Sequence, residues 1–191
     1  MRRIEEEILK RGKILPGNVL KVNSFLNHQL DTKLLCIMAD EWYELFKDSN
    51  ITKIVTIESS GIALATIAGL KFNVPVVFAK KGFNLNIENS YSTTVYSYSK
   101  KRDYFISIEK EFLSEEDNVL IIDDFLANAS AALGLISLVK KAKGNVVGVG
   151  IAIEKGFQPG GSILRKKGYR VESLAIIESM DYDSQSIIFR Q

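Results

Sequence analysis

Cysteine and histidine are almost absent from the 191 residues, and their scarcity excludes several kinds of chemistry. Cys36 is the only cysteine, so an internal disulfide and a cysteine metal cluster are both excluded. His28 is the only histidine and lies in a polar stretch without a partner motif, where a surface or boundary position is the simpler interpretation. A zinc site made of several histidines cannot form, and a Ser–His–Asp triad would have to use His28. We therefore do not expect histidine chemistry at the centre of the function.

Long apolar runs and an excess of one charge are also missing. The apolar runs reach only strand length, well short of the roughly 18–20 residues that a membrane helix needs. The formal net charge of +2 gives no general basic field for nucleic acid. Glu5, Glu6 and Glu7 stand where a signal peptide would carry its apolar region. We expect a cytoplasmic location, with neither a membrane nor a nucleic acid as partner.

The composition and the order of the predicted helices and strands are typical of a globular α/β domain. Hydrophobic residues make up 46% of the chain and charged residues 25%, and the length fits one domain over residues 1–191. Helical patterns occur over residues 1–10, 31–49, 62–71, from about 131 onward, and 163–168. Apolar strand patterns occur over residues 51–57, 74–80, 118–124, 145–155 and 169–180. Because these strands are apolar almost throughout, we expect a mostly parallel, twisted sheet flanked by helices.

Two of the predicted helices have a recognisable, mostly apolar face that is expected to be buried. In the first, Asp31 is the expected N-cap and the face consists of Leu34, Ile37, Met38, Glu41 and Leu45. In the second, the face expected to pack on the sheet consists of Ala132, Leu135, Ile136 and Val139, with Gly144 as the helix stop.

Residues 82–112 interrupt the α/β pattern. Alternating polar and apolar residues over 92–99 and 104–112, with a turn at 100–103, predict an antiparallel hairpin. An insertion of this length is usually functional, so we expect a flap or lid. Residues 1–40 are expected to form a helical N-terminal cap.

Ligands of an open parallel sheet bind beyond the carboxyl ends of its strands. The segments that follow the predicted strands are Glu58–Gly61, Lys80–Lys81, the loop that begins at Asp123, and Glu154–Lys155. Small loops, several cations and two carboxylates are therefore expected at one edge of the sheet.

The stretch VLIIDDFLANASA combines a phosphate cradle with two acids. Its small and polar residues precede or form a helix N-terminus, where unpaired N–H groups attract anions; they are Ala127, Asn128, Ala129, Ser130 and Ala131. Asp123 and Asp124 suit the vicinal hydroxyls of a sugar or a hydrated Mg²⁺. Together these features fit a ribose 5-phosphate. Taken alone, the two aspartates could equally be an N-cap and a solvated neighbour, and no P-loop or dinucleotide motif is present.

The same stretch resembles the thirteen-residue motif for phosphoribosyl pyrophosphate (PRPP) of the type I phosphoribosyltransferases. Further segments resemble the bacterial xanthine-specific members of that family: VLKVNSFLNHQLD, ITKIVTIESSGIA, VPVVFA, VYSYSK, LIIDDFLAN and IEKGFQPGG. The resemblance implies the type I phosphoribosyltransferase fold, with a hood at about 1–40 and a flap at about 82–112. It further implies transfer of ribose 5-phosphate from PRPP to N9 of xanthine, Mg²⁺ bound mainly through PRPP or pyrophosphate, no metal ligands from the protein, and a homodimer.

The resemblance also implies roles for individual residues. Purine contacts would come from Leu20, Asn27, Lys155 and Phe157. Residues Ala127 to Ala131 would hold the 5′-phosphate, and Asp123 and Asp124 would be the catalytic acids that face the ribose. Pyrophosphate would meet Ser59, Ser60 and Lys80, beneath a flap formed by VYSYSK.

One departure from the family pattern lies in the phosphate loop. Relatives commonly have glycine where this chain has Ala129, and often glutamine where it has Ser130. If φ is positive, alanine costs about 1 kcal/mol or more relative to glycine. Either the loop is helical enough there to accept a methyl group, or phosphate affinity is reduced.

Three alternatives remain open at this point. The protein could be a PRPP-sensing regulator without catalysis, although the N-terminal segment is too short for a helix-turn-helix domain. It could also prefer guanine or hypoxanthine as its base. A generic nucleotide-binding α/β domain is the third alternative, which the extended matches disfavour. Trp42 and Tyr43 could form a dimer interface, and Trp42 could equally belong to the core.

Overall fold

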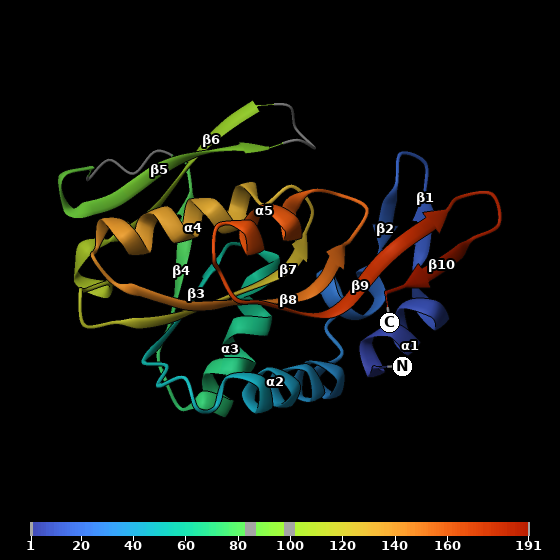
Figure 1. Cartoon of the computed structure of the whole chain (residues 1–191), viewed down its shortest axis with the longest axis horizontal. Helices are drawn as coiled ribbons and strands as arrows, with labels where there is room; N and C mark the ends of the chain where they lie inside the picture. The colour runs from blue at the N-terminus through green and yellow to red at the C-terminus, as the bar shows by residue number, and fades with distance from the viewer. Residues whose placement is uncertain (1, 83–86, 98–101, 191) are drawn as a thin grey trace.

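The computed structural model describes residues 2–82, 87–97 and 102–190 (Figure 1). Its main strands are β3 (Lys53–Ile57), β4 (Val76–Lys81), β5 (Ser90–Ser97), β6 (Arg102–Glu109), β7 (Asn118–Leu126), β8 (Asn145–Lys155), β9 (Val171–Asp181) and β10 (Ser186–Phe189). They form one sheet with the order β10-β9-β8-β7-β3-β4-β6-β5. The five strands from β9 to β4 run parallel, and the others add antiparallel edges. The expected mostly parallel sheet is confirmed.

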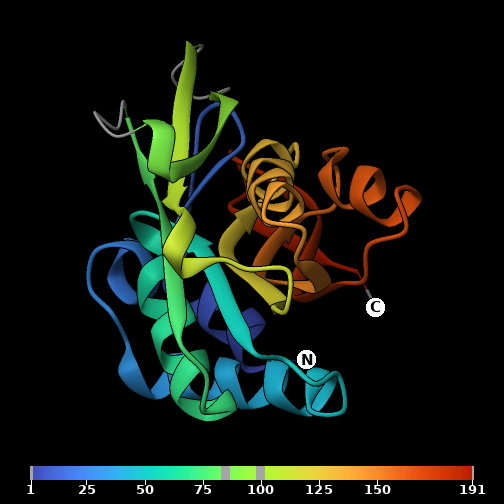
Figure 2. The same cartoon turned by 90° about the vertical axis from the view of Figure 1, so that its left-hand side faces the viewer.

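Helices cover both faces of this sheet (Figures 1 and 2). The helices α2 (Thr32–Phe46) and α3 (Ser60–Phe72) pack on one face, and α4 (Ser130–Lys141) packs on the other, with the short α5 (Gly160–Lys166) beside it. Because side chains alternate along a strand, neighbouring residues reach different cores. Ile54 packs in the core shared with α2 and α3, and Val55 packs in the core shared with α4.

The N-terminal region differs from the prediction. The helix α1 (Arg3–Arg11) is as expected, but the predicted break is an antiparallel hairpin of β1 (Lys13–Leu15) and β2 (Val19–Lys21). Gly17 and Asn18 form its turn with φ of 79° and 59°. Strands of three residues are too short for an alternating pattern to reveal them. A π-helical turn, η1 (Asn23–Asn27), leads from the hairpin toward α2.

The predicted antiparallel hairpin is confirmed as β5 paired with β6. The hairpin lies over α4, where Gly134 makes the approach possible because a Cβ there would lie 2.5 Å from Val95 Cγ2. Lys141 Nζ also donates a hydrogen bond to the carbonyl of Ser92. The turn of the hairpin, with the last three residues of VYSYSK, lies outside the described residues.

The predicted start of α2 is confirmed, but its buried face is shifted. Asp31 caps the helix, and its Oδ1 accepts a hydrogen bond from Leu34 N at 3.2 Å. Ile37, expected on the buried face, is exposed, while Trp42 is completely buried. Trp42 is therefore a core residue and not an interface residue, and half-buried Tyr43 packs its ring against Phe72 at 5.2 Å between centroids.

Two further expectations concern the C-terminal half. The four apolar residues of α4 are buried against the sheet as expected, but the helix ends at Lys141 and the left-handed residue after it is Lys143, not Gly144. The strand β9 is not the last one, because β10 folds back antiparallel to it.

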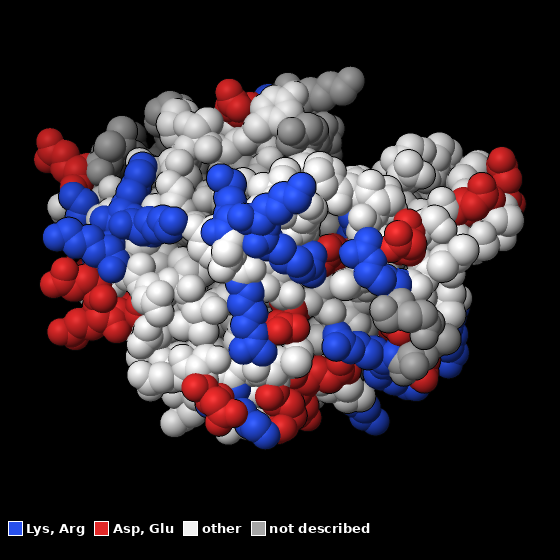
Figure 3. Space-filling model, viewed as in Figure 1, with Lys and Arg blue, Asp and Glu red and all other residues white. Residues whose placement is uncertain are grey.

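Charged side chains of the two signs gather on different parts of the surface. Figure 3 shows Lys and Arg gathered over α4 and α5 and acidic side chains gathered along α2. Among the described residues, no helix has the length and hydropathy needed to cross a membrane. His28 and Cys36 are both exposed.

Candidate active site

The sheet order brings the expected loops together at one edge. β4, β3, β7 and β8 are consecutive parallel neighbours, so their carboxyl ends lie side by side. Across this edge the chain presents, in order, Lys80–Lys81, Glu58–Ser60, Asp123–Asp124 and Glu154–Lys155. The sequence therefore located the edge of the sheet correctly.

The two aspartates differ sharply in their surroundings. Asp123 is only 5% exposed, and its Oδ1 accepts a hydrogen bond from Asp124 N at 3.0 Å. Asp124 is half-buried, and its Oδ1 accepts from Phe125 N at 2.9 Å. Burial, followed by the neighbouring charge of Asp124, raises the pKa of Asp123 well above its usual range. The pair therefore concentrates negative charge where little water reaches it.

The first turn of α3 closes tightly over Asp123. A Cβ on Gly61 would lie 3.1 Å from Asp123 Oδ1 and 2.1 Å from Thr56 Oγ1. The Thr56 hydroxyl is fully buried and has no hydrogen-bond partner in the described residues. Glycine is therefore required at position 61 for the close approach of α3 to the acid pair. Neither Thr56 nor Gly61 belongs to a recognisable acidic or cationic pattern, so the sequence alone indicates no role for either residue.

The loop before α4, where a phosphate is expected to bind, is strained at Ala129. This residue has φ of 69° and ψ of 6°, in the left-handed region, and the helix α4 begins only at Ser130. The alternative that the loop is helical at this position is therefore wrong. Asn128 Oδ1 accepts a hydrogen bond from Ser130 N at 3.0 Å, which leaves the Asn128 amide hydrogens available to an anion. The N–H groups of the next residues, Ala131 and Ala132, have no acceptor within the helix by its geometry.

A glycine from another part of the chain supports this loop. Gly160, at the start of α5, donates from its N–H to the carbonyl of Ala127 at 2.8 Å. A Cβ on Gly160 would lie 2.4 Å from that carbonyl oxygen and 2.8 Å from Ala129 N. The PGG sequence is the signal that could have found it, but only the folded chain shows which loop it contacts.

The neighbouring lysines of β4 point in different directions. The side chain of Lys80 is exposed to solvent, and its Nζ lies 3.8 Å from Glu109 Oε1. The charge of Lys81 acts on Asp123, and its ammonium lies 5.7 Å from the ring centroid of Tyr104 on β6. Tyr104 has a raised pKa because of burial and, second, because of the negative charge of Asp123. Lys81, expected at this edge of the sheet, and Tyr104, which no sequence pattern indicated, therefore both interact electrostatically with Asp123.

The loop after β3 faces the same edge. Ser59 precedes α3 and is exposed, and Ser60 is the first residue of that helix. Glu58 accepts a hydrogen bond from Lys81 N through its side chain, which links this loop to the end of β4. The peptide bond between Glu58 and Ser59 is cis.

Lys155 is held at the other side of the acid pair. Its Nζ donates a hydrogen bond of 2.8 Å to the carbonyl of Asn18, in the turn of the β1–β2 hairpin, and lies 6.0 Å from the ring centroid of Phe125. Burial lowers the pKa of Lys155 below its usual range. The ammonium is thus partly withdrawn from water and oriented.

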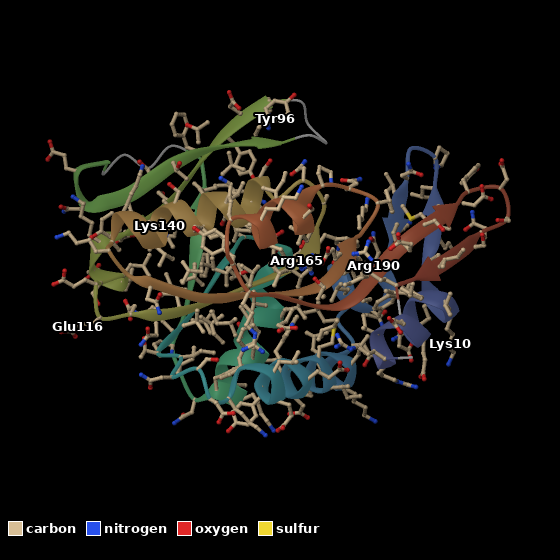
Figure 4. All side chains as sticks on the ribbon, in the orientation of Figure 1. Lys10, Tyr96, Glu116, Lys140, Arg165 and Arg190 are labelled. Carbon is tan, nitrogen blue, oxygen red and sulfur yellow. The ribbon has the colours of Figure 1, made fainter. Side chains whose placement is uncertain are left out.

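The other three expected purine-contact residues lie in different environments. Leu20 is buried in β2, Asn27 is exposed at the end of η1, and Phe157 is 38% exposed in the loop after β8. The loop that carries Phe157 is anchored by Glu154, which is 2% exposed and receives two hydrogen bonds of 2.8 Å from Arg165. Figure 4 shows Arg165 between α5 and the neighbouring strands.

The donor set at this edge fits a magnesium ion held mostly by a ligand. No group of three or more acidic, histidine or cysteine side chains with metal-binding spacing occurs among the described residues. Two carboxylates are present, and Mg²⁺ is commonly bound by one or two carboxylates together with substrate phosphates and water. Asp123 and Asp124 are the residues that would face such an ion.

The fold and this edge define the class of the protein. The model of the phosphoribosyl transferase domain matches residues 27–184. An APRTase from Giardia lamblia, solved with 9-deazaadenine, superposes with a TM-score of 0.78 at 24% identity, over 92% of this chain and 98% of that chain. The adenine phosphoribosyltransferase of Saccharomyces cerevisiae superposes with a TM-score of 0.72 at 23% identity, over 90% and 98%. The fold is that of the type I phosphoribosyltransferases.

Sequence relatives narrow the assignment. The chain is 52% identical to a xanthine phosphoribosyltransferase of Bifidobacterium adolescentis over the full length of both chains. It is 54% identical to one of Oceanobacillus iheyensis, over 94% of this chain and 93% of the relative, and 52% identical to one of Listeria innocua, over 99% and 98%. The chain therefore belongs to the phosphoribosyltransferase family, in the branch of the xanthine phosphoribosyltransferases.

The strain at Ala129 makes a prediction about substitutions in the phosphate loop. We expect Ala129→Val to lower the free energy of unfolding by more than about 2 kcal/mol, because a β-branched residue resists positive φ. Ala129→Gly relieves the strain but loses a buried methyl group, so its net effect should stay within about 1 kcal/mol. Urea denaturation measures both. The matched control is Ala131→Val, in the first turn of α4, and equal losses for the two valine variants would contradict the prediction.

Burial of Asp123 makes a second prediction. Since the pKa of Asp123 is raised, the folded protein binds this proton more tightly than the unfolded chain. The stabilising contribution of the group is therefore complete below the ordinary pKa of 3.8 and is lost as the pH rises through the raised value. Asp123→Asn stays neutral and keeps the oxygen that accepts from Asp124 N. We expect this variant to melt at a higher temperature than the parent at pH 7.

Thermal unfolding between pH 4 and pH 8 measures this effect in the ligand-free protein. The difference in melting temperature between variant and parent should grow with pH. Asp183→Asn, at an exposed position, is the control and should show no such trend. A variant that is less stable than the parent at every pH would show that the carboxylate of Asp123 is not destabilising.

Proposed function

We propose that this protein transfers the 5-phosphoribosyl group of PRPP to N9 of xanthine, with xanthosine 5′-monophosphate and pyrophosphate as products. The observation that carries the proposal is full-length identity of about one half to proteins named xanthine phosphoribosyltransferase. The site is consistent with this reaction, because Asp123 and Asp124 lie between the N-termini of α3 and α4, and Lys155 lies on the other side of the two acids.

The sugar phosphate is proposed to bind at the start of α4. Residues Ala127 to Ala131 offer N–H groups, the positive end of a helix and small side chains that let a phosphate come close. Asp123 and Asp124 then meet the ribose hydroxyls. Positive charge that develops on the ribose as pyrophosphate leaves is stabilised by these carboxylates, most strongly by the buried one, because electrostatic interactions are stronger away from water.

The leaving group is proposed to lie at the start of α3. Ser59, Ser60 and the first N–H groups of that helix suit an anion, and the nearby cations are Lys80 and Lys81. Mg²⁺, bound mainly through the phosphate oxygens, would supply further neutralisation of the leaving charge. Positioning and charge are sufficient for this reaction, so no histidine or cysteine nucleophile is required.

The purine is proposed to lie between the hood and the end of β8. Xanthine carries exocyclic oxygens at C2 and C6, and the oriented ammonium of Lys155 is suited to donate to one of them. Leu20, Asn27 and Phe157 are the further purine contacts of the proposal. The flap over α4 is proposed to exclude water from the activated sugar. A homodimer, which rests on the family resemblance, and the cytoplasmic location expected from the sequence complete the proposal.

A pyrophosphate-release assay with PRPP, Mg²⁺ and each purine base tests the proposal. We expect xanthine to give the highest kcat/KM. A preference for guanine or hypoxanthine would keep the reaction and overturn the choice of base. Tight PRPP binding without turnover of any base would instead identify a non-catalytic regulator.

The proposed roles also predict a separation of activity from stability. Asp124→Asn should lower kcat by about 100-fold, because loss of one charge that faces the transition state typically costs two orders of magnitude or more. Its melting temperature should not fall, since asparagine keeps the acceptor for Phe125 N and removes the charge beside the buried Asp123. Glu116→Gln, at an exposed site, is the control. Parallel losses of melting temperature and activity would contradict a catalytic role.

A further inference from the structure

The β1–β2 hairpin holds the side chain that is proposed to recognise the base. Lys155 Nζ donates its 2.8 Å hydrogen bond to a backbone carbonyl of this hairpin, that of Asn18. A backbone carbonyl cannot adjust by changing rotamer, so movement of the hairpin moves the ammonium. The inference below rests on the proposed role of Lys155 in base binding.

The hairpin has little intrinsic stability. It pairs only three residues with three, Lys13 with Lys21, Ile14 with Leu20 and Leu15 with Val19, and it is not part of the main sheet. Isolated two-stranded hairpins are marginal in water. The direct pairing of Lys13 with Lys21 adds repulsion between like charges. Something outside the hairpin must therefore fix its position.

Gln185 supplies such a contact from the opposite end of the chain. Its Oε1 accepts from Ile14 N at 3.0 Å, and its Nε2 donates to Ile14 O at 3.0 Å. One side-chain amide thus satisfies both backbone groups of the middle residue of β1, as a neighbouring strand would. In Figure 1 the β1–β2 and β9–β10 hairpins lie side by side.

The turn that carries Gln185 is itself well fixed. Gln185 Nε2 also donates to the carbonyl of Tyr182 at 2.7 Å, and Asp181 Oδ1 accepts from Ser184 N at 2.7 Å and Ser184 Oγ at 2.6 Å. Gln185 has φ of 52°, a conformation that glycine or asparagine would adopt more easily. A residue with a long amide side chain occupies this strained position and uses the amide to contact β1.

We propose that Gln185 is a positioning residue for base binding. It fixes the β1–β2 hairpin, and through Asn18 the hairpin fixes the ammonium of Lys155. Gln185 does not contact the proposed sugar site, so its effect should fall on the base and not on PRPP.

Steady-state kinetics of Gln185→Ala tests this proposal. We expect KM for xanthine to rise about five- to tenfold, the loss expected from one or two hydrogen bonds, while kcat and KM for PRPP stay within twofold. Gln185→Glu has nearly the same shape but lacks the N–H donors, so it should raise KM for xanthine as well. Asp183→Asn on the same turn is the control and should leave all three constants unchanged.

A double-mutant cycle with Lys155→Met shows whether Gln185 acts through the lysine. If it does, Gln185→Ala should have no further effect on KM for xanthine in the Lys155→Met background. Hydrogen exchange of residues 13–21 should be faster in Gln185→Ala, whatever the substrate. Unchanged exchange, an unchanged KM for xanthine, or the same increase with and without Lys155 would overturn the proposal.

Kinetics of the unmutated parent protein distinguish a failure of this inference from a failure of the proposed function. If the parent does not turn over xanthine, the proposed choice of base fails, and the same cycle is run with the purine that the parent accepts. A selective effect on KM for that purine would then support the positioning role, and its absence would overturn it.

Discussion

The interaction on which the rest of the structure depends is the burial of one carboxylate directly beside another at the end of β7. Asp123 is almost completely buried, and the charge of Asp124 lies next to it. An arrangement of this kind raises the free energy of the unliganded protein, because neither water nor a fully compensating cation accompanies the buried charge. It becomes favourable when positive charge develops nearby. The folded protein therefore holds this negative charge in place on a central strand before any ligand binds, and a ligand that develops positive charge is stabilised by it.

The loops around this strand are held in place by residues distant in sequence. Gly61 lets α3 approach Asp123, and Gly160 supports the strained loop at Ala129 from the start of α5. Gln185 and Lys155 connect the hood to the same edge from the C-terminal half. Strain at Ala129 is tolerated because its neighbours are fixed on both sides. Geometry at the site is thus a property of the whole sheet and not of one motif.

The sequence predicted the parts of this arrangement that depend on local pattern. Long apolar runs gave the parallel strands, and the small residues after Asp124 gave the start of α4. The β1–β2 hairpin was missed because its strands have three residues, and β10 because it has only four. The contacts of Gly160 and Gln185 join segments that no periodicity relates, one of them across 171 positions. The sequence placed both Lys80 and Lys81 at this edge, and only the folded chain shows that the charge of Lys81 acts on Asp123.

The central claim is that a phosphorylated, activated sugar binds with its 5′-phosphate at the start of α4 and its hydroxyls on the acid pair. A crystal structure of the protein with PRPP and Mg²⁺ is the most direct measurement. The account predicts the 5′-phosphate against the N–H groups of residues 127–131 and the ribose hydroxyls within hydrogen-bond distance of Asp123 and Asp124. A 5′-phosphate bound at another edge of the sheet, or a ribose that does not touch these carboxylates, would contradict it.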